Sequence, residues 1–287
     1  MKLDGRREST NVEDRRGTSS VGKVAGLGIG GIALVAIITL MMGGNLGDVV
    51  QNVQNAGGLG GITTQNNYEP TAENEELATF SKQVLALTED VWSAYFKQKG
   101  LGDYRNPTLV LYSGATATAC GTGQSAMGPF YCSGDEKLYI DLSFFSSMKQ
   151  QLGADGDFAY AYVIAHEVGH HVQNLLGTLS QAHSQMARMN TTDSNRMSVR
   201  IELQADFYAG VWSHYIDEVL DDDDLLEAIK CAQVIGDDYL QKKAQGYAVE
   251  ESFTHGTAAQ RMRWLKKGMT TGDVSQGNTF SLSDSQL

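Results

Sequence analysis

The chain has 287 residues, which is enough for one sizeable hydrophobic core together with additional segments. Its net charge of -12 argues against nucleic acid as a partner, because phosphate backbones attract basic surfaces. The same negative charge disfavours broad contact with anionic lipid head groups.

The first apolar stretch, residues 24–42, is 19 residues long and contains no charged side chain. This length suffices for a helix that crosses the bilayer core, and a cleaved signal peptide is the alternative. Six lysines and arginines precede the stretch, and none follows it before Lys82. The positive-inside rule therefore predicts a single-pass transmembrane helix over 24–42, a cytoplasmic tail over 1–23 and an extracytoplasmic domain, either periplasmic or extracellular. The spacing of Gly26 and Gly30 is compatible with a homodimer through this helix.

The segment over 43–70 is rich in Gly, Asn and Gln, which predicts a flexible linker before a folded domain over 71–267. Two short runs over 107–113 and 137–142 have the composition of strands. Helical spacing of apolar residues predicts helices over 73–100, 144–152, 158–176 and 195–220, and another from 221–224 to about 245. We expect an α+β fold, mostly helical with a small β-sheet, followed by a C-terminal tail over 268–287 with little regular structure.

The stretch AYVIAHEVGHHVQNLLG, residues 161–177, has three histidines and a glutamate within six residues. On a helix, His166 and His170 share a face because they are four residues apart, whereas His171 points about 100° away from them. Glu167 lies beside the first histidine. This is the HExxH pattern, in which two imidazoles bind one zinc ion and the carboxylate acts as general base. The alternative is a helix with two ordinary histidines, but the apolar neighbours favour a metal as their partner.

A zinc site requires at least a third protein ligand. A third histidine in the pattern HExxHxxGxxH is excluded, because Gln173 and Leu176 stand where it needs glycine and histidine. The second long helix offers Glu202 as the ligand, and Asp206, four residues later, shares its face. Asp206 can accept the free ring N–H of a metal-bound histidine and so fix its orientation. Gly210 is small and would let the two helices approach closely.

A further candidate for a catalytic residue lies just before a predicted helix. The capping-box spacing of Thr257 and Gln260 predicts that this helix begins at Thr257. His255 is the candidate for a group that stabilises a tetrahedral oxyanion beside the metal. Arg261 is the candidate for a positioning partner of Asp206 or of the site. Weaker candidates for the role of His255 are Tyr247 and His214.

Two of the cysteines, Cys120 and Cys132, lie in one glycine-rich segment. If the domain is outside the cytoplasm, a disulfide between them would close a short loop and stabilise the fold by roughly 3 kcal/mol. Cys231 lies within a helical pattern and is expected to be a buried apolar residue. Ligation of zinc by the cysteines is not expected, because no C-x-x-C pair occurs.

The chain resembles the neutral zinc metallopeptidase family of bacteria, whose members have a short N-terminal anchor. The resemblance extends over nearly the whole chain and rests on GRRESTNVEDRRG, CGTGQSAMGPFYC, KLYIDLSFF, AYVIAHEVGHHVQNLLG, ELQADFYAGVW and THGTAAQRMRW. It implies a membrane-anchored zinc peptidase of gluzincin type, with His166, His170 and Glu202 as ligands and Glu167 as base. The histidine six residues before an arginine, here His255 and Arg261, is similar to the arrangement in minimal gluzincins.

The function expected from the sequence is hydrolysis of peptide bonds in a peptide or protein substrate, with a zinc-activated water and Glu167 as general base. The run over 137–142 is a candidate edge strand for an extended substrate. Two alternatives remain: a non-catalytic, zinc-stabilised binding or scaffold module, and a zinc hydrolase of a non-peptide amide. A structural zinc site has no need of a carboxylate base, so Glu167 favours an enzyme over a scaffold.

Overall fold

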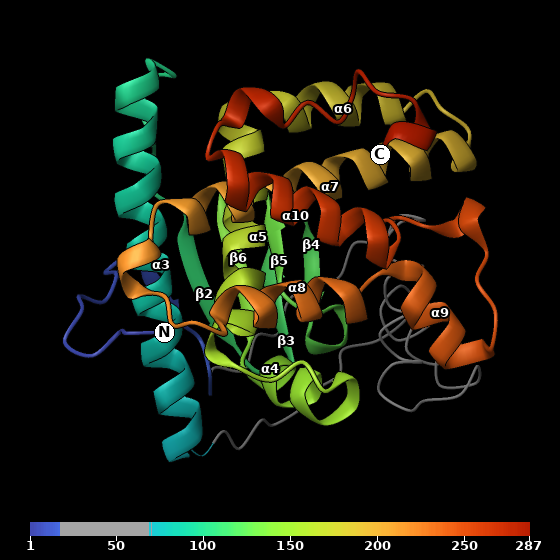
Figure 1. The fold of residues 1–287 in the computed structure, drawn as a ribbon. Coiled ribbons are helices and arrows are strands. Elements are labelled where there is room, and N and C mark those ends of the chain that lie inside the picture. The colour runs from blue at the N-terminus through green and yellow to red at the C-terminus, as the bar shows by residue number, and fades with distance from the viewer. Residues whose placement is uncertain (18–68, 70) are drawn as a thin grey trace. The chain divides into compact units, whose positions relative to one another are not determined.

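The computed structural model of the protein describes residues 1–17, 69 and 71–287. The predicted transmembrane helix over 24–42 lies outside these residues, as does nearly all of the predicted linker over 43–70. Among the helices of the described part, none is both long enough and apolar enough to cross a membrane. The mostly helical α+β architecture with a small sheet is confirmed (Figure 1).

The chain forms two compact units, and their limits differ from the predicted domains. The first unit comprises Met1–Ser9, Gln83–Asn106 and Ala154–Leu287. The second unit comprises Thr10–Lys82 and Pro107–Gly153. The described part of the predicted N-terminal tail therefore belongs to the two units, and the predicted C-terminal tail belongs to the first.

The second unit contains a four-stranded sheet in the order β1-β2-β6-β5. Its strands are β1 (Val12–Asp14), β2 (Thr108–Tyr112), β6 (Lys137–Asp141) and β5 (Phe130–Cys132). Strand β2 is parallel to both β1 and β6, and β5 is antiparallel to β6. Both strands predicted from the sequence, β2 and β6, have four consecutive buried residues. Because β6 has a neighbour on each side, the prediction that it is an edge strand for a substrate is wrong.

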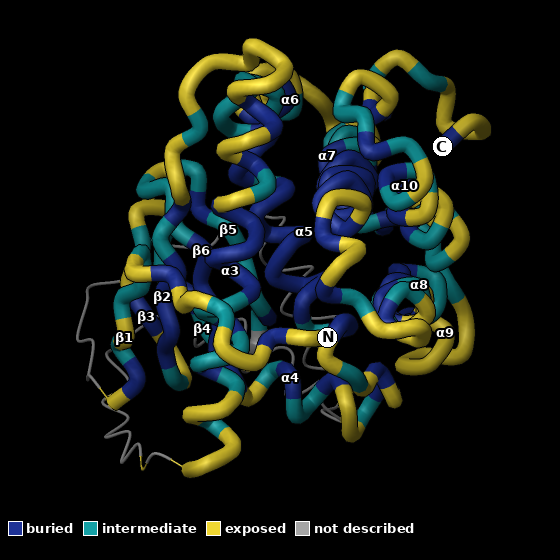
Figure 2. Tube along the Cα trace, turned by 60° about the vertical axis from the view of Figure 1, so that its left-hand side comes forward, coloured by how far each residue is buried: buried dark blue, intermediate teal, exposed yellow. Residues whose placement is uncertain are grey.

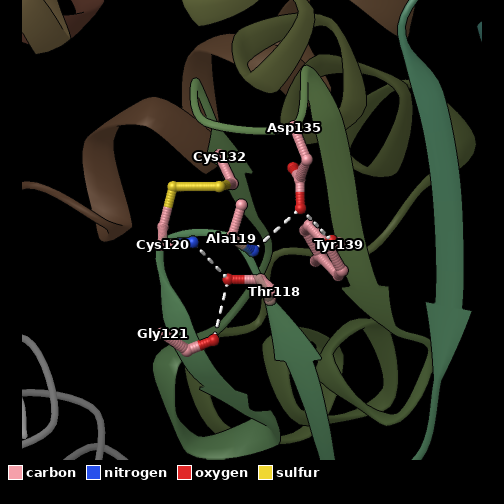
Figure 3. The surroundings of a disulfide bond; sticks show 7 residues. All are labelled: Thr118, Ala119, Cys120, Gly121, Cys132, Asp135 and Tyr139. Carbon is pink, nitrogen blue, oxygen red and sulfur yellow. Dashed lines mark hydrogen bonds between the residues drawn. A yellow bond between two sulfur atoms is a disulfide. The ribbon is translucent and has the colours of Figure 1, made fainter. Parts of the chain in front are cut away.

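A two-stranded hairpin in the same unit is joined to the sheet by a disulfide (Figure 3). Strands β3 (Ala115–Thr118) and β4 (Gly121–Gln124) are antiparallel. Cys120 in the hairpin turn is bonded to Cys132 at the end of β5. The turn is also held by Asp135, which accepts hydrogen bonds from the backbone N–H of Ala119 and the hydroxyl of Tyr139. The disulfide thus fixes a short segment that has few apolar side chains of its own.

The long helix α3 (Ala72–Lys99) has acidic residues in its first turn and lysines in its last turn, which favours a helix through the macrodipole. Its residues up to Lys82 belong to the second unit and the rest to the first. The segment predicted as a helix over 144–152 consists of the short helix α4 (Ser143–Ser147) and a π-helical turn (Met148–Leu152). Gly153 ends this turn in the left-handed region, with φ of 63°.

The first unit is an assembly of helices in which α5 and α7 are largely buried (Figure 2). Its helices from residue 154 onward are α5 (Asp157–Leu175), α6 (Thr178–Met186), α7 (Thr191–His214), α8 (Asp224–Val234), α9 (Asp237–Gln245) and α10 (Ala258–Thr271). The capping box predicted at Thr257 is present, with Gln260 as its second member.

Three parts of this unit differ from the sequence prediction. Helix α7 ends at His214, and a 3₁₀ turn follows at Asp217–Val219. The helix expected up to about residue 245 is divided at Gly236, whose extended backbone separates α8 from α9. A Cβ on Gly236 would lie 2.3 Å from the backbone nitrogen of Ala258, so this close contact requires glycine. The segment after Gly268 is well packed: α10 continues to Thr271, and Leu287 is 2% exposed and accepts a hydrogen bond from Trp264.

Helices α7 and α10 lie side by side at a contact between two glycines (Figure 1). A Cβ on Gly210 would lie 2.2 Å from the carbonyl oxygen of Leu265, and a Cβ on Gly268 would lie 2.1 Å from that of Phe207. Gly210 therefore brings α10 close to α7. The prediction that Gly210 serves the approach of the two metal-binding helices is wrong.

Replacement of Gly268 by alanine tests this close packing. Alanine is the better helix former by about 1 kcal/mol, so propensity alone predicts a more stable protein. Because the added Cβ overlaps backbone atoms of α7, we expect Gly268→Ala to lower the free energy of unfolding by about 1–3 kcal/mol. The exposed Thr270→Ala on the same helix is the control and should change it by less than about 0.5 kcal/mol. Denaturant unfolding of both variants gives the answer, and a stabilised Gly268→Ala would contradict the packing.

Candidate metal centre

The site is built by two helices that approach closely at Gly169 of α5. A Cβ on Gly169 would lie 2.8 Å from the carbonyl oxygen of Ala205 in α7. The sequence forms α5 because it has no proline, has helix-compatible apolar residues, and has its acidic Asp157 in the first turn. Close approach of the backbones brings polar side chains of α5 and α7 within hydrogen-bonding distance of one another.

The three predicted metal ligands lie together. His166, His170 and Glu202 each offer one ligand atom, and these atoms are all within 4.8 Å of one another. Glu202 Oε2 lies 3.0 Å from His166 Nε2, and Glu202 Oε1 lies 3.6 Å from His170 Nε2. A tetrahedral zinc ion at ~2.0–2.2 Å from each donor requires donors roughly 3.3–3.6 Å apart. The two imidazoles and the carboxylate are thus gathered closely enough for one ion to reach a donor atom of each.

His166 is oriented by the buried carboxylate of Asp206. The His166 Nδ1–H donates to Asp206 Oδ1 at 2.7 Å, which leaves Nε2, the nitrogen beside Glu202, as the donor atom for a metal. Tyr162 donates to the same oxygen at 2.6 Å, and Arg261 donates to both carboxylate oxygens at 2.9 Å. Burial alone would raise the pKa of Asp206, but the charges of Arg261 and His166 outweigh it and lower this pKa to about 2. Asp206 is therefore a carboxylate at any physiological pH.

His170 is oriented by Gln173, a residue whose role the sequence analysis missed. The His170 Nδ1–H donates to Gln173 Oε1 at 2.9 Å. The Gln173 amide in turn donates to the carbonyl oxygen of Ile201 at 2.8 Å and to Gln204 at 3.0 Å. Gln173 is fully buried, and its three bonds fix the orientation of the His170 ring against α7. The sequence signal for this role was a glutamine three residues after a histidine on the same predicted helix, where the two side chains are neighbours.

Glu167 lies next to the ligands, and its side chain makes no hydrogen bond or ion pair with another residue in the described ranges. Its side chain is buried at 7% exposure. Burial raises the pKa of Glu167 above its ordinary value, and the charges of His170 and His166 oppose this rise. A buried carboxylate without a protein partner is able to accept and release a proton, which is what a general base requires.

His255 lies close enough to influence both carboxylates of the site, since its charge acts on the pKa of Glu167 and of Glu202. Its Nδ1 lies 3.2 Å from Asp237 Oδ1, and Asp237 Oδ2 accepts the backbone N–H of His255 at 2.7 Å. Asp237 also accepts the backbone N–H groups of Thr254 and Gly256. Burial lowers the pKa of His255, but the Asp237 carboxylate outweighs burial and raises it. Asp237 thus fixes both the loop and the ring of His255, and it was missed in the sequence.

The other histidines and Tyr247 have different surroundings. His171 is fully buried and donates from Nε2 to the carbonyl oxygen of Arg105 at 2.6 Å, away from the metal ligands, as its position about 100° further round the helix predicts. His214 bonds the carbonyl oxygen of Met269 at 2.9 Å at the end of α7. Tyr247 is 61% exposed. Among the described histidine, cysteine and acidic side chains, neither His171 nor His214 belongs to the group that could hold a metal.

Comparison with known proteins identifies the family. The family model described as "Putative neutral zinc metallopeptidase" matches residues 1–280. The uncharacterized protein YpfJ of Escherichia coli K12 is 47% identical over 292 residues, covering 99% of this chain and 100% of the relative. The uncharacterized protein Rv2575 of Mycobacterium tuberculosis is 43% identical over 197 residues, covering 64% of this chain and 66% of the relative. No solved structure matches the chain.

The chain therefore belongs to the neutral zinc metallopeptidase family, and the resemblance stated from its motifs is confirmed. The metal of this family is zinc, and His166, His170 and Glu202 are positioned to bind it.

Metal content tests the ligand set. The full chain purified without chelators should carry about one zinc ion per molecule. Replacement of His166, His170 or Glu202 by alanine should each remove most of it, because a zinc site with two protein ligands binds weakly. The matched control is His171→Gln, which keeps a donor for the Arg105 carbonyl and should keep its zinc. Elemental analysis of folded protein provides the measurement, and loss of zinc from His171→Gln as complete as from His170→Ala would rule out this ligand set.

Proposed function

We propose that the protein is a zinc-dependent peptidase that hydrolyses peptide bonds in peptide or protein substrates. The observation that carries this proposal is the buried Glu167, which has no hydrogen-bond partner among the described residues and adjoins the His166, His170 and Glu202 cluster. A purely structural zinc site does not need such a carboxylate and closes its fourth position with another ligand. Glu167 therefore favours an enzyme over a zinc-stabilised scaffold.

The chemistry that zinc supplies when bound in such a site is a lowered pKa of water, toward ~7, and polarisation of a substrate carbonyl. Glu167 accepts the proton of the attacking water and later returns it to the leaving amine. Its raised pKa brings it closer to the pH at which both transfers are efficient. Asp206 and Gln173 hold the two histidine rings in the tautomer with a free Nε2.

His255 is the group we assign to the oxyanion. Asp237 accepts the Nδ1–H and favours the doubly protonated ring, so Nε2–H is left to donate to the negative oxygen that develops on the substrate. The assignment is supported by the charge of His255 acting on Glu167 and Glu202. His214 and Tyr247 are poorer candidates, since the first bonds a backbone carbonyl and the second is largely exposed.

We also propose that the apolar segment over 24–42 attaches the protein to a membrane and that the metal centre lies outside the cytoplasm. The disulfide between Cys120 and Cys132 supports the second part, because disulfides persist in oxidising compartments. The spacing of Gly26 and Gly30 supports a homodimer through the apolar segment as part of this proposal.

The variant Glu167→Gln tests whether Glu167 is the general base of a hydrolytic reaction. It keeps the size of the side chain and removes its ability to take a proton, so zinc and fold should be retained. A positioned proton-transfer group contributes about 10²–10⁴-fold, so hydrolysis of a casein or peptide-library substrate should fall by that factor. Zinc content and cleavage are measured on the same preparation. Full activity in Glu167→Gln would refute the proposed mechanism.

The pH profile tests the pair formed by His255 and Asp237. His255→Ala should retain zinc and lose about 10²–10³-fold in kcat, as expected for an oxyanion donor. Asp237→Asn keeps an acceptor for the loop N–H groups but removes the charge that raises the pKa of His255. Because the charged ring persists to higher pH only while Asp237 is ionised, the alkaline limb of kcat should move to lower pH in Asp237→Asn. If the alkaline limb of kcat lies at the same pH in Asp237→Asn as in the parent protein, His255 does not act as the charged donor.

A further inference from the structure

We propose that residues 1–17 form an N-terminal arm that lies on the same, extracytoplasmic side of the membrane as the metal centre. The residues before and after the apolar segment over 24–42 then lie on the same side of the membrane. A single crossing by that segment would instead put them on opposite sides. The proposal differs from the cytoplasmic N-terminus expected from the sequence. It does not depend on the protein being a peptidase.

The second half of the arm is a strand of the sheet. Val12, Glu13 and Asp14 pair in parallel with residues 109–111 of β2. The backbone N–H of Leu109 donates to the carbonyl oxygen of Asn11 at 2.9 Å, and the N–H of Arg15 donates to that of Leu111 at 2.7 Å. A three-residue strand with this register requires the arm and β2 to fold together in one compartment.

The first half of the arm forms hydrogen bonds with polar side chains of α3 in the first unit. The buried carboxylate of Glu89, which is 3% exposed, accepts from Arg7 at 3.0 Å on one oxygen and from Ser9 at 2.6 Å on the other. Gln83 donates to the carbonyl oxygens of Leu3 and Arg6 at 3.1 and 3.3 Å. Withdrawal of the arm would remove these partners from a buried acid, which is costly.

The lysines and arginines of the arm form ion pairs within the fold. Their presence is therefore weaker evidence that the N-terminus is cytoplasmic. Arg7 pairs with Glu89 and Asp90, and the 5%-exposed side chain of Arg16 pairs with Asp14 and Glu75. Lys2, Arg6 and Arg15 have acidic partners as well: Asp221, Glu218 and Glu13. The positive-inside rule counts lysine and arginine near a span, and here the fold accounts for five of the six.

The compartment follows from the disulfide, because β1 and the bond between Cys120 and Cys132 belong to the same compact unit. Disulfides form and persist outside the reducing cytosol. The arm is therefore folded where that disulfide forms. A chain that crosses the bilayer once between residues 17 and 71 would put the arm on the opposite side from β2, so this topology cannot give the fold.

Thiol labelling of the full chain in spheroplasts tests the proposal. Asp4→Cys places a thiol on an exposed position of the arm, and Asp222→Cys places one on an exposed position before α8 as the matched control. The parent protein sets the background, since Cys231 is buried and the other two cysteines are bonded. With a membrane-impermeant maleimide, both variants should be labelled to the same extent before the membrane is permeabilised.

Labelling of Asp222→Cys in intact spheroplasts with labelling of Asp4→Cys only after permeabilisation would overturn the proposal. Labelling of both only after permeabilisation would also overturn it, because the arm would then be cytoplasmic. A co-expressed cytoplasmic thiol protein that stays unlabelled shows that the membrane is intact.

A charge exchange tests the docking of the arm in the purified full chain. Glu13 in β1 pairs with Lys137 in β6. Glu13→Lys should lower the Tm by roughly 2–4 °C, and the double variant Glu13→Lys with Lys137→Glu should recover most of the loss. If the single variant leaves the Tm unchanged, the arm is not docked as a strand and the proposal fails.

Discussion

The ion pair between Asp206 and Arg261 is the interaction on which the rest of the site depends. Asp206 is fully buried on α7, and its two oxygens are shared by Arg261 of α10 and by Tyr162 and His166 of α5. Three helices are therefore joined at one carboxylate. Removal of one partner from a buried pair costs about 3–5 kcal/mol, so this carboxylate couples the stability of the helix assembly to the orientation of a metal ligand.

A second constraint is the distance between the helices. Glycine at 169 and at 210 lets α7 approach α5 on one side and α10 on the other, with no room for a Cβ at either contact. At this separation Glu202 reaches both imidazoles, and Gln173 reaches the backbone of α7 while it holds His170. Apart from Glu167, the buried polar side chains of the site satisfy one another, which explains how an apolar helix can carry so many of them.

The sequence predicted those parts of the molecule that depend on local geometry. His166 and His170 were predicted from i,i+4 spacing, and this spacing survives any arrangement of the helices. Glu202 was predicted because a zinc site needs a third ligand and the second long helix offers this carboxylate. Asp237 was missed because it acts on His255 from 18 residues away, which helical periodicity cannot report. Strand β1 was missed because three residues without an apolar pattern become a strand only through pairing with β2, a long-range contact. Gly210 was recognised as small, but the helix that it faces depends on the fold.

The most direct test of this account is a crystal structure of the full chain with anomalous diffraction measured at the zinc absorption edge. The account predicts one anomalous peak bonded to the Nε2 atoms of His166 and His170 and to a carboxylate oxygen of Glu202. Asp206 should stay on His166 Nδ1, and Glu167 should lie beside the ion without binding it. A peak ligated by Glu167 or His171, or a peak away from α5 and α7, would contradict it.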